Sequence, residues 1–116
     1  TGGRGAHVII TAAAAHTPQQ QAQWMAAPGG RISFFGGLPK DDPVISCDSN
    51  QVHYRELSIV GANGSSPAHN ARALELIGTG EVPVHDLVTH RVPLADVHRA
   101  LDLVARGEAI KVTVEP

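Results

Sequence analysis

The 116-residue chain carries nine Lys and Arg against eleven Asp and Glu, a formal net charge of −2 at pH 7, which suits one small domain with a modest core. It has no cluster of basic side chains, so nucleic acid is excluded as a partner. Its apolar runs are far shorter than the ~20 residues of a membrane span, and no signal peptide opens it. We therefore expect a soluble, cytoplasmic protein.

The first half of the chain predicts two apolar strands separated by a helix. Residues Ala6–Thr11 form a β-branched apolar run, typical of a strand that is buried on both faces of a parallel sheet. Thr17 is the expected N-cap of the helix, with Pro18 in the first helical position and the end near Ala27. A Pro-Gly-Gly turn breaks the helix, and the next strand covers residues 31–35.

The middle of the chain is less regular. Residues 38–49 are rich in Pro, Asp and Ser and predict a loop. Residues 52–54 and 57–60 predict two short strands. Ser66 before a proline then predicts a second helix, which should stop at Gly80.

The closing residues predict a strand, a helix and a final strand. The strand lies in the run that begins at Leu87. The helix starts at Pro93, carries apolar residues at i, i+3, i+4 and i+7, and ends at Gly107 in a left-handed C-cap. The final strand carries Lys111. Short strands alternating with helices predict an α/β fold with a mainly parallel sheet and flanking helices.

The cysteine and histidine content limits metal and thiol chemistry. The single cysteine, Cys47, cannot form an internal disulfide or a cysteine-rich zinc site, and we expect its side chain to be buried. The seven histidines are scattered without zinc-ligand spacing. No Ser-His-Asp set, nucleophile elbow or P-loop is visible. The sequence therefore predicts no metal ligand and no catalytic residue in this chain.

Four segments together resemble the C-terminal third of the zinc-type medium-chain alcohol and polyol dehydrogenases, such as sorbitol and threonine dehydrogenases. They are residues 8–13, 30–39, 53–61 and 86–116. The resemblance implies the second half of a Rossmann-type sheet, followed by a helix and strand that return toward the catalytic domain. The glycines before the first strand cannot form the phosphate-binding turn, because that turn follows a strand.

In that family, residues 1–84 would be the C-terminal half of the dinucleotide-binding domain and residues 85–116 the segment returning to the catalytic domain. The parent enzyme would transfer hydride between an alcohol, in the polyol or sugar-alcohol class, and NAD or NADP. Zinc would polarise the alcohol oxygen, and its ligands lie upstream in the family. This chain alone is therefore expected to be inactive. NAD and NADP are not distinguished, because the discriminating residue belongs to the first half of the domain.

The resemblance also implies which residues contact the cofactor. Backbone after the first strand would flank the ribose, backbone after the second would pass the nicotinamide ring, and the third strand and its end would bind the carboxamide. A lysine near the C-terminus would reach the pyrophosphate. The residues are Ala12, Ala13, Phe35, Gly36, Gly37, Leu38, Ser58, Val60, Gly61, Ala62, Asn63 and Lys111.

Two other interpretations stay open at this point. Edge strands within residues 51–61 would let copies of the chain pair, as an association module or as the contact that builds a homodimer or homotetramer in the family. A zinc-free quinone reductase relative would share the cofactor fold. The closing Thr-His-Arg-Val-Pro-Leu run argues against that second interpretation.

Overall fold

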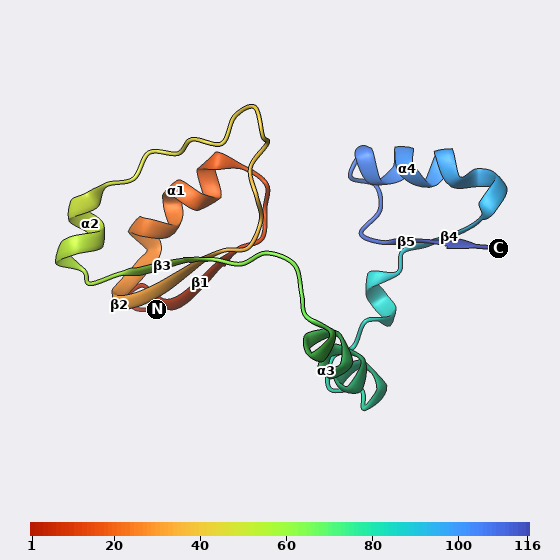
Figure 1. Cartoon of the computed structure of the whole chain (residues 1–116), viewed down its shortest axis with the longest axis horizontal. Helices are drawn as coiled ribbons and strands as arrows, with labels where there is room; N and C mark the ends of the chain where they lie inside the picture. Colours follow the sequence, from red (N-terminus) through yellow and green to blue (C-terminus); the bar gives the residue numbers. More distant parts are fainter. The chain divides into compact units, whose positions relative to one another are not determined.

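The computed structural model describes residues Thr1–Pro116 and divides them into two compact units. The first unit is Thr1–Gly64 and the second is Ser65–Pro116. Figure 1 labels the elements of both along the chain. The boundary expected between residues 84 and 85 separates domains of a parent enzyme, and it stays a prediction.

The first unit is a parallel three-stranded sheet with two helices. Its elements are β1 (Ala6–Thr11), α1 (His16–Met25), β2 (Ala26–Phe34), α2 (Ser49–Tyr54) and β3 (Ser58–Gly61). β2 lies in the centre and pairs in parallel with β1 and with β3. Parallel neighbours require a crossover, which α1 supplies between β1 and β2 (Figure 1).

One row of isoleucines forms the centre of this unit. Ile9 pairs with Ile32, and Ile32 pairs with Ile59, so each strand places one isoleucine in the same register. Ile32 is completely buried, and Ala22 of α1 and Leu57 pack in the same cluster. Side chains alternate along a strand, so this row faces α1 and its neighbours face the other way.

The other face of the sheet is open. Val8, Ile10 and Val60 are 64%, 62% and 53% exposed. The prediction that the first strand is buried on both faces is therefore wrong for this chain, because both helices of the unit contribute to the Ile32 side only. Parallel sheets are normally covered on both faces, so this apolar face is the least protected surface of the unit.

The bounds of α1 and β2 differ from the prediction. The helix begins at His16 with Ala15 as N-cap and no side-chain cap, so Thr17 and Pro18 lie inside its first turn. β2 begins at Ala26, before the expected break, because a register shift between Ala6 and Val8 absorbs the Pro-Gly-Gly segment within the strand.

The prediction of a strand at residues 52–54 is also wrong. These residues belong to α2, where the Asp48 side chain accepts hydrogen bonds from the backbone N–H groups of Asn50 and Gln51 at 2.9 and 3.4 Å. Such a cap satisfies donors at the helix start, and the apolar alternation did not reveal it. The loop before α2 and the strand β3 after it are confirmed.

The second unit contains a separate pair of parallel strands. Its elements are α3 (Pro67–Gly78), the 3₁₀ turns η1 (His85–Leu87) and η2 (Leu94–Asp96), β4 (His90–Pro93), α4 (Val97–Ala105) and β5 (Val112–Glu115). β4 pairs with β5 from His90 opposite Val112 to Pro93 opposite Glu115. Val92 of β4 and Ala100 of α4 are its buried apolar residues.

Helix ends in the second unit follow the predicted signals. Ser66 caps α3 by accepting from the His69 N–H, in a reciprocal capping box. Gly107 has a φ of 69°, and its N–H donates to the carbonyl of Val104 at 3.0 Å, which confirms the left-handed C-cap. The α-helix begins four residues after Pro93, however, because a 3₁₀ turn precedes it.

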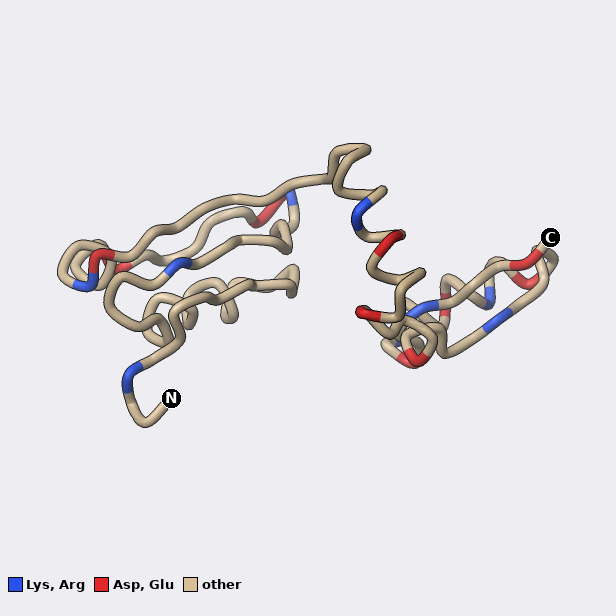
Figure 2. Tube along the Cα trace, turned by 90° about the horizontal axis from the view of Figure 1, so that it is seen from below, with Lys and Arg blue, Asp and Glu red and all other residues tan.

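The surface of the molecule carries the one cysteine. Cys47 is exposed, so the prediction of a buried thiol is wrong, because this residue lies in the irregular segment before α2. Lys and Arg are scattered in both units (Figure 2). None of the helices has both the length and the apolar character that crossing a membrane requires.

Candidate cofactor site

The three strands of the first unit end at one edge of the sheet. Thr11, Phe34 and Gly61 are the last residues of β1, β2 and β3, and they lie directly opposite one another in the register. The chain therefore leaves the sheet at the same level three times. In open α/β sheets, ligands bind outside the carboxyl ends of the parallel strands.

Backbone hydrogen bonds join these strand ends after the regular ladder stops. The Gly36 N–H donates to the Thr11 carbonyl at 2.7 Å, and the Ala62 N–H donates to the Phe34 carbonyl at 3.2 Å. The Thr11 hydroxyl also donates to the Ser33 carbonyl at 3.3 Å. The residues that follow β2 and β3 are consequently fixed by main-chain hydrogen bonds to the last residues of β1 and β2.

Gly36 is required by this arrangement. A Cβ atom at Gly36 would lie 2.9 Å from the carbonyl carbon and oxygen of Ala13 and 3.1 Å from the carbonyl carbon of Ala12. The backbone of Ala12 and Ala13 therefore requires a glycine here, which is a reason inside the protein. Gly37 and Gly61, by contrast, have no atom within 4 Å of the place a Cβ would take.

Most of the predicted cofactor residues gather at this edge. Ala12 and Ala13 touch Gly36, Phe35 is 62% exposed beside them, and Ala62 is bonded to Phe34. The other predicted residues lie within two positions of these, either in the sequence or in the pairing of β2 with β3. They are Gly37, Leu38, Val60, Gly61 and Asn63.

Ser58 lies away from the strand ends, and Lys111 belongs to the other unit. Ser58 begins β3 opposite Arg31, three residues or about 10 Å before the strand end. Lys111 belongs to the second unit, just before β5, with its side chain exposed. Its carbonyl accepts from the N–H groups of Thr89 and His90 at 3.0 and 3.3 Å, so its main chain is fixed at the β4–β5 junction.

The sequence analysis missed the polar side of α1. Gln19 and Gln23 are 5% and 1% exposed, and both hydrogen-bond to the segment between β2 and α2. The signal in the sequence was their spacing: Gln19 and Gln23 are four residues apart and share one helix face with the small residue Ala22. Glutamine side chains are mostly exposed in proteins, so a glutamine-rich helix gives little sign of a buried polar face.

No metal cluster accompanies the strand ends. No group of three or more His, Cys, Asp or Glu side chains is placed to hold a metal ion. A shallow hollow of about 260 Å³ lies at the opposite end of β1, where Ala6 begins the strand, and Trp24 and Met25 of α1 line it. The candidate site is thus an edge built mainly from backbone groups.

Comparison with known proteins identifies the family. A family model described as zinc-binding dehydrogenase matches residues 1–79, which is more than half of the chain. The chain belongs to the zinc-binding dehydrogenase family. The resemblance inferred from four separate segments of the sequence is confirmed.

Individual relatives agree with this membership. A protein of Arthroderma otae named "Probable D-xylulose reductase A" is 33% identical over 112 residues, which cover 97% of this chain and 31% of that protein. An alcohol dehydrogenase of Thermotoga maritima has 27% identity and a TM-score of 0.87 over 99% of this chain and 32% of its own. This likeness confirms the predicted part of a Rossmann-type parallel sheet.

A third relative was solved with a cofactor. A protein of Sinorhizobium meliloti 1021, described as a zinc-binding dehydrogenase and bound to NADP, has 25% identity and a TM-score of 0.84. The match covers 97% of this chain and 32% of that one. The chain therefore spans about a third of the length of the zinc-binding dehydrogenases that it matches.

The close contact at Gly36 gives a testable consequence. Gly36→Ala places a methyl group against the Ala13 carbonyl, so we expect it to lower the free energy of unfolding by about 1–3 kcal/mol. The matched control, Gly37→Ala, adds a methyl group in open space and should change that free energy by less than about 0.5 kcal/mol. Urea denaturation measures both. Equal effects of the two substitutions would contradict the packing role of Gly36.

Proposed function

We propose that this chain is the C-terminal part of an NAD(P)-dependent zinc-type dehydrogenase that transfers hydride between an alcohol and the dinucleotide. The main support is the shared edge at which β1, β2 and β3 end, within a chain of the zinc-binding dehydrogenase family. We infer a polyol or sugar alcohol as the substrate class, supported by the likeness to a relative whose name specifies D-xylulose.

The residues at the strand ends fit a dinucleotide in this proposal. Open space beside Gly37 and Gly61 would let a planar ring approach the backbone, and exposed Phe35 offers apolar surface next to it. Ala12 and Ala13 carry the smallest side chains at the end of β1. When bound, the dinucleotide would exchange hydride with the alcohol carbon while zinc, held by residues outside this chain, polarises the alcohol oxygen.

The contribution of the chain itself would be positional. Main-chain groups on either side of the nicotinamide would fix which face of the ring meets the substrate. Two hydrogen bonds limit the movement of these groups: the Gly36 N–H donates to the Thr11 carbonyl, and the Ala62 N–H donates to the Phe34 carbonyl. Lys111 would add a positive charge for the pyrophosphate, without the two-pronged geometry of arginine. We infer no catalytic residue in the chain, so the isolated chain should be inactive.

Activity of the complete protein tests this proposal. The reading frame upstream of Thr1 should encode a glycine-rich phosphate turn and Cys, His and Glu metal ligands. The protein expressed from that frame should oxidise polyols such as xylitol or sorbitol with NAD or NADP, as followed by nicotinamide absorbance. A chelator should abolish the activity. Absence of dinucleotide-dependent oxidation across alcohols and polyols, in a folded and zinc-loaded preparation, would refute the proposed reaction.

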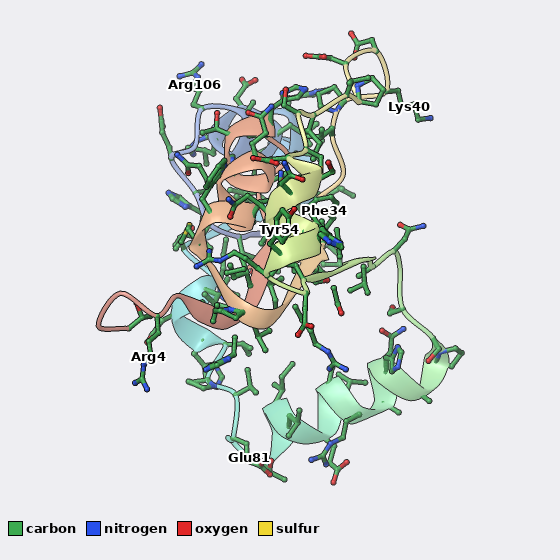
Figure 3. All side chains as sticks on the ribbon, turned by 90° about the vertical axis from the view of Figure 1, so that its left-hand side faces the viewer. Arg4, Phe34, Lys40, Tyr54, Glu81 and Arg106 are labelled. Carbon is green, nitrogen blue, oxygen red and sulfur yellow. The ribbon has the colours of Figure 1, made fainter.

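Lys111 gives a more local test. In the complete protein, Lys111→Ala should raise the dissociation constant for the dinucleotide about tenfold, because an ionic contact to phosphate is lost. Lys111→Arg should keep or strengthen binding. Arg106→Ala removes an exposed positive charge from the end of α4 in the same unit and serves as the control (Figure 3). Similar weakening by Lys111→Ala and Arg106→Ala would indicate general electrostatics instead of a phosphate contact.

A second candidate function is self-association, favoured by the position of β3 at the edge of the sheet. An edge strand has unpaired N–H and C=O groups that could pair with those of a second copy, which would build a homodimer or homotetramer.

Sedimentation tests this association, and we expect the measured mass to exceed that of a monomer. Ser58→Lys introduces a lysine in the edge strand and should reduce the sedimentation mass. Ser65→Lys lies outside the strand and should leave the mass unchanged. A monomeric mass at all concentrations would exclude this association.

A further inference from the structure

The segment between β2 and α2 has no regular structure, yet α1 holds it along its whole length. The Gln19 amide Nε2 donates to the Gly36 carbonyl at 2.8 Å. The Gln23 amide Nε2 donates to the Ser46 carbonyl at 3.2 Å, and its Oε1 accepts from the Asp48 N–H at 2.9 Å. We call residues 36–48 the strap. Its main chain is therefore bound to helix side chains at both ends.

A further contact lies between these two anchors. The ring nitrogen Nε2 of His16 is 2.9 Å from the carbonyl oxygen of Asp42 and 3.3 Å from its carboxylate. His16, Gln19 and Gln23 fall at i, i+3 and i+7, which puts them on one face of α1. Along the strap the contacts fall on Gln19, then on His16 and last on Gln23, so together they cover this face from the first turn of the helix to its last. Lys40 points outward from the strap (Figure 3).

Burial makes the two glutamines unusual. Gln23 is 1% exposed and Gln19 is 5% exposed, as deeply buried as Ala22 between them. A buried amide destabilises a protein unless its polar atoms are hydrogen-bonded, and no buried side-chain polar atom here lacks a partner. Apolar side chains would fill the same space, but they would leave the strap carbonyls without donors. The glutamines are therefore matched to the backbone of the strap.

The Gln19 contact reaches the candidate cofactor site directly. The Gly36 N–H is bound to the Thr11 carbonyl of β1, and the Gly36 carbonyl is bound to Gln19 of α1. Both polar groups of this residue are thus fixed by elements that flank the strand ends. The orientation of the peptide after Gly36, and so the path of Gly37 and Leu38, depends on the Gln19 side chain.

The Gln23 contact has a different consequence. It binds Ser46 and Asp48, and the Asp48 carboxylate caps α2. Gln23 therefore connects the far end of the strap to α1 and to the start of α2. These helices lie side by side in Figure 3, next to the strap.

We propose that Gln19 and Gln23 are positioning residues that hold the strap against α1, and that Gln19 sets the place of the Gly36–Gly37 backbone at the cofactor. The second part rests on the proposed dehydrogenase function, whereas the first part does not. Gln19 acts through Gly36 without touching the cofactor. Gln23 keeps the strap from lifting at its other end.

The test uses the complete protein and three matched substitutions in one helix. Gln19→Met and Gln23→Met keep the length of the side chain but remove its hydrogen bonds. Gln21→Met makes the same change at an exposed position of α1 that does not bond to the strap. Two measurements are made: amide hydrogen exchange of the strap without cofactor, and the KM for dinucleotide, the KM for alcohol and kcat.

Loss of one such hydrogen bond corresponds to about a threefold to tenfold change in an equilibrium. We expect Gln19→Met to speed exchange of the backbone amides of Gly37, Leu38 and Lys40–Asp42. It should also raise the KM for dinucleotide by this factor, with the KM for alcohol unchanged. Gln23→Met should speed exchange of the backbone amides of Val44–Asp48 and change the KM for dinucleotide less. Exchange in β1 and β3 should not change, because local opening of the strap leaves the sheet intact.

Different results overturn different parts. Strap exchange that is the same in Gln19→Met, Gln23→Met and Gln21→Met would refute the positioning role altogether. Faster strap exchange with an unchanged KM for dinucleotide would refute the role of Gln19 at the cofactor. If the unaltered protein binds no dinucleotide, the proposed function fails, and the exchange measurement still decides whether the two glutamines hold the strap.

Discussion

The common register of three parallel strand ends is the constraint on which the rest of the first unit depends. Thr11, Phe34 and Gly61 lie opposite one another, so the chain turns away from the sheet at one level. The Gly36 N–H bond to Thr11 extends this alignment beyond the strands. A displacement by one residue would move the Ile32 row out of the core and separate the turns that follow, because side chains alternate between the faces of a sheet.

The two faces of the sheet are covered unequally. On one face, α1, α2 and Leu57 bury the isoleucine row, whereas Val8 and Ile10 on the other face remain open. Sheets of this parallel kind are normally covered on both sides. The chain also spans about a third of the length of the zinc-binding dehydrogenases it matches. Both observations agree with our proposal that the chain acts as part of a larger enzyme.

A polar helix face complements the apolar one. α1 buries Ala22 against the sheet and, through Gln19 and Gln23, binds the backbone of an irregular segment. The carbonyls of Gly36 and Ser46 accept from side chains of α1, so this helix supplies donors as well as apolar surface. The same helix thus supports both the core and the wall of the candidate site. Both roles fall to α1 because the thirteen-residue strap between β2 and α2 has no regular structure of its own.

The sequence by itself determined the α/β class, the strand Ala6–Thr11, the Ser66 cap of α3 and the Gly107 C-cap, because each depends on residues close together in the chain. It also indicated the family through four segments. Tertiary structure decided what depends on distant partners. α2 is held in place because Gln23 binds the Asp48 N–H and Val52 packs against the core. Gly36 is needed because Ala13 lies beside it, and the glutamines of α1 are buried because the strap crosses them. Local periodicity contains no information on contacts between segments twenty residues apart, so only the folded chain shows them.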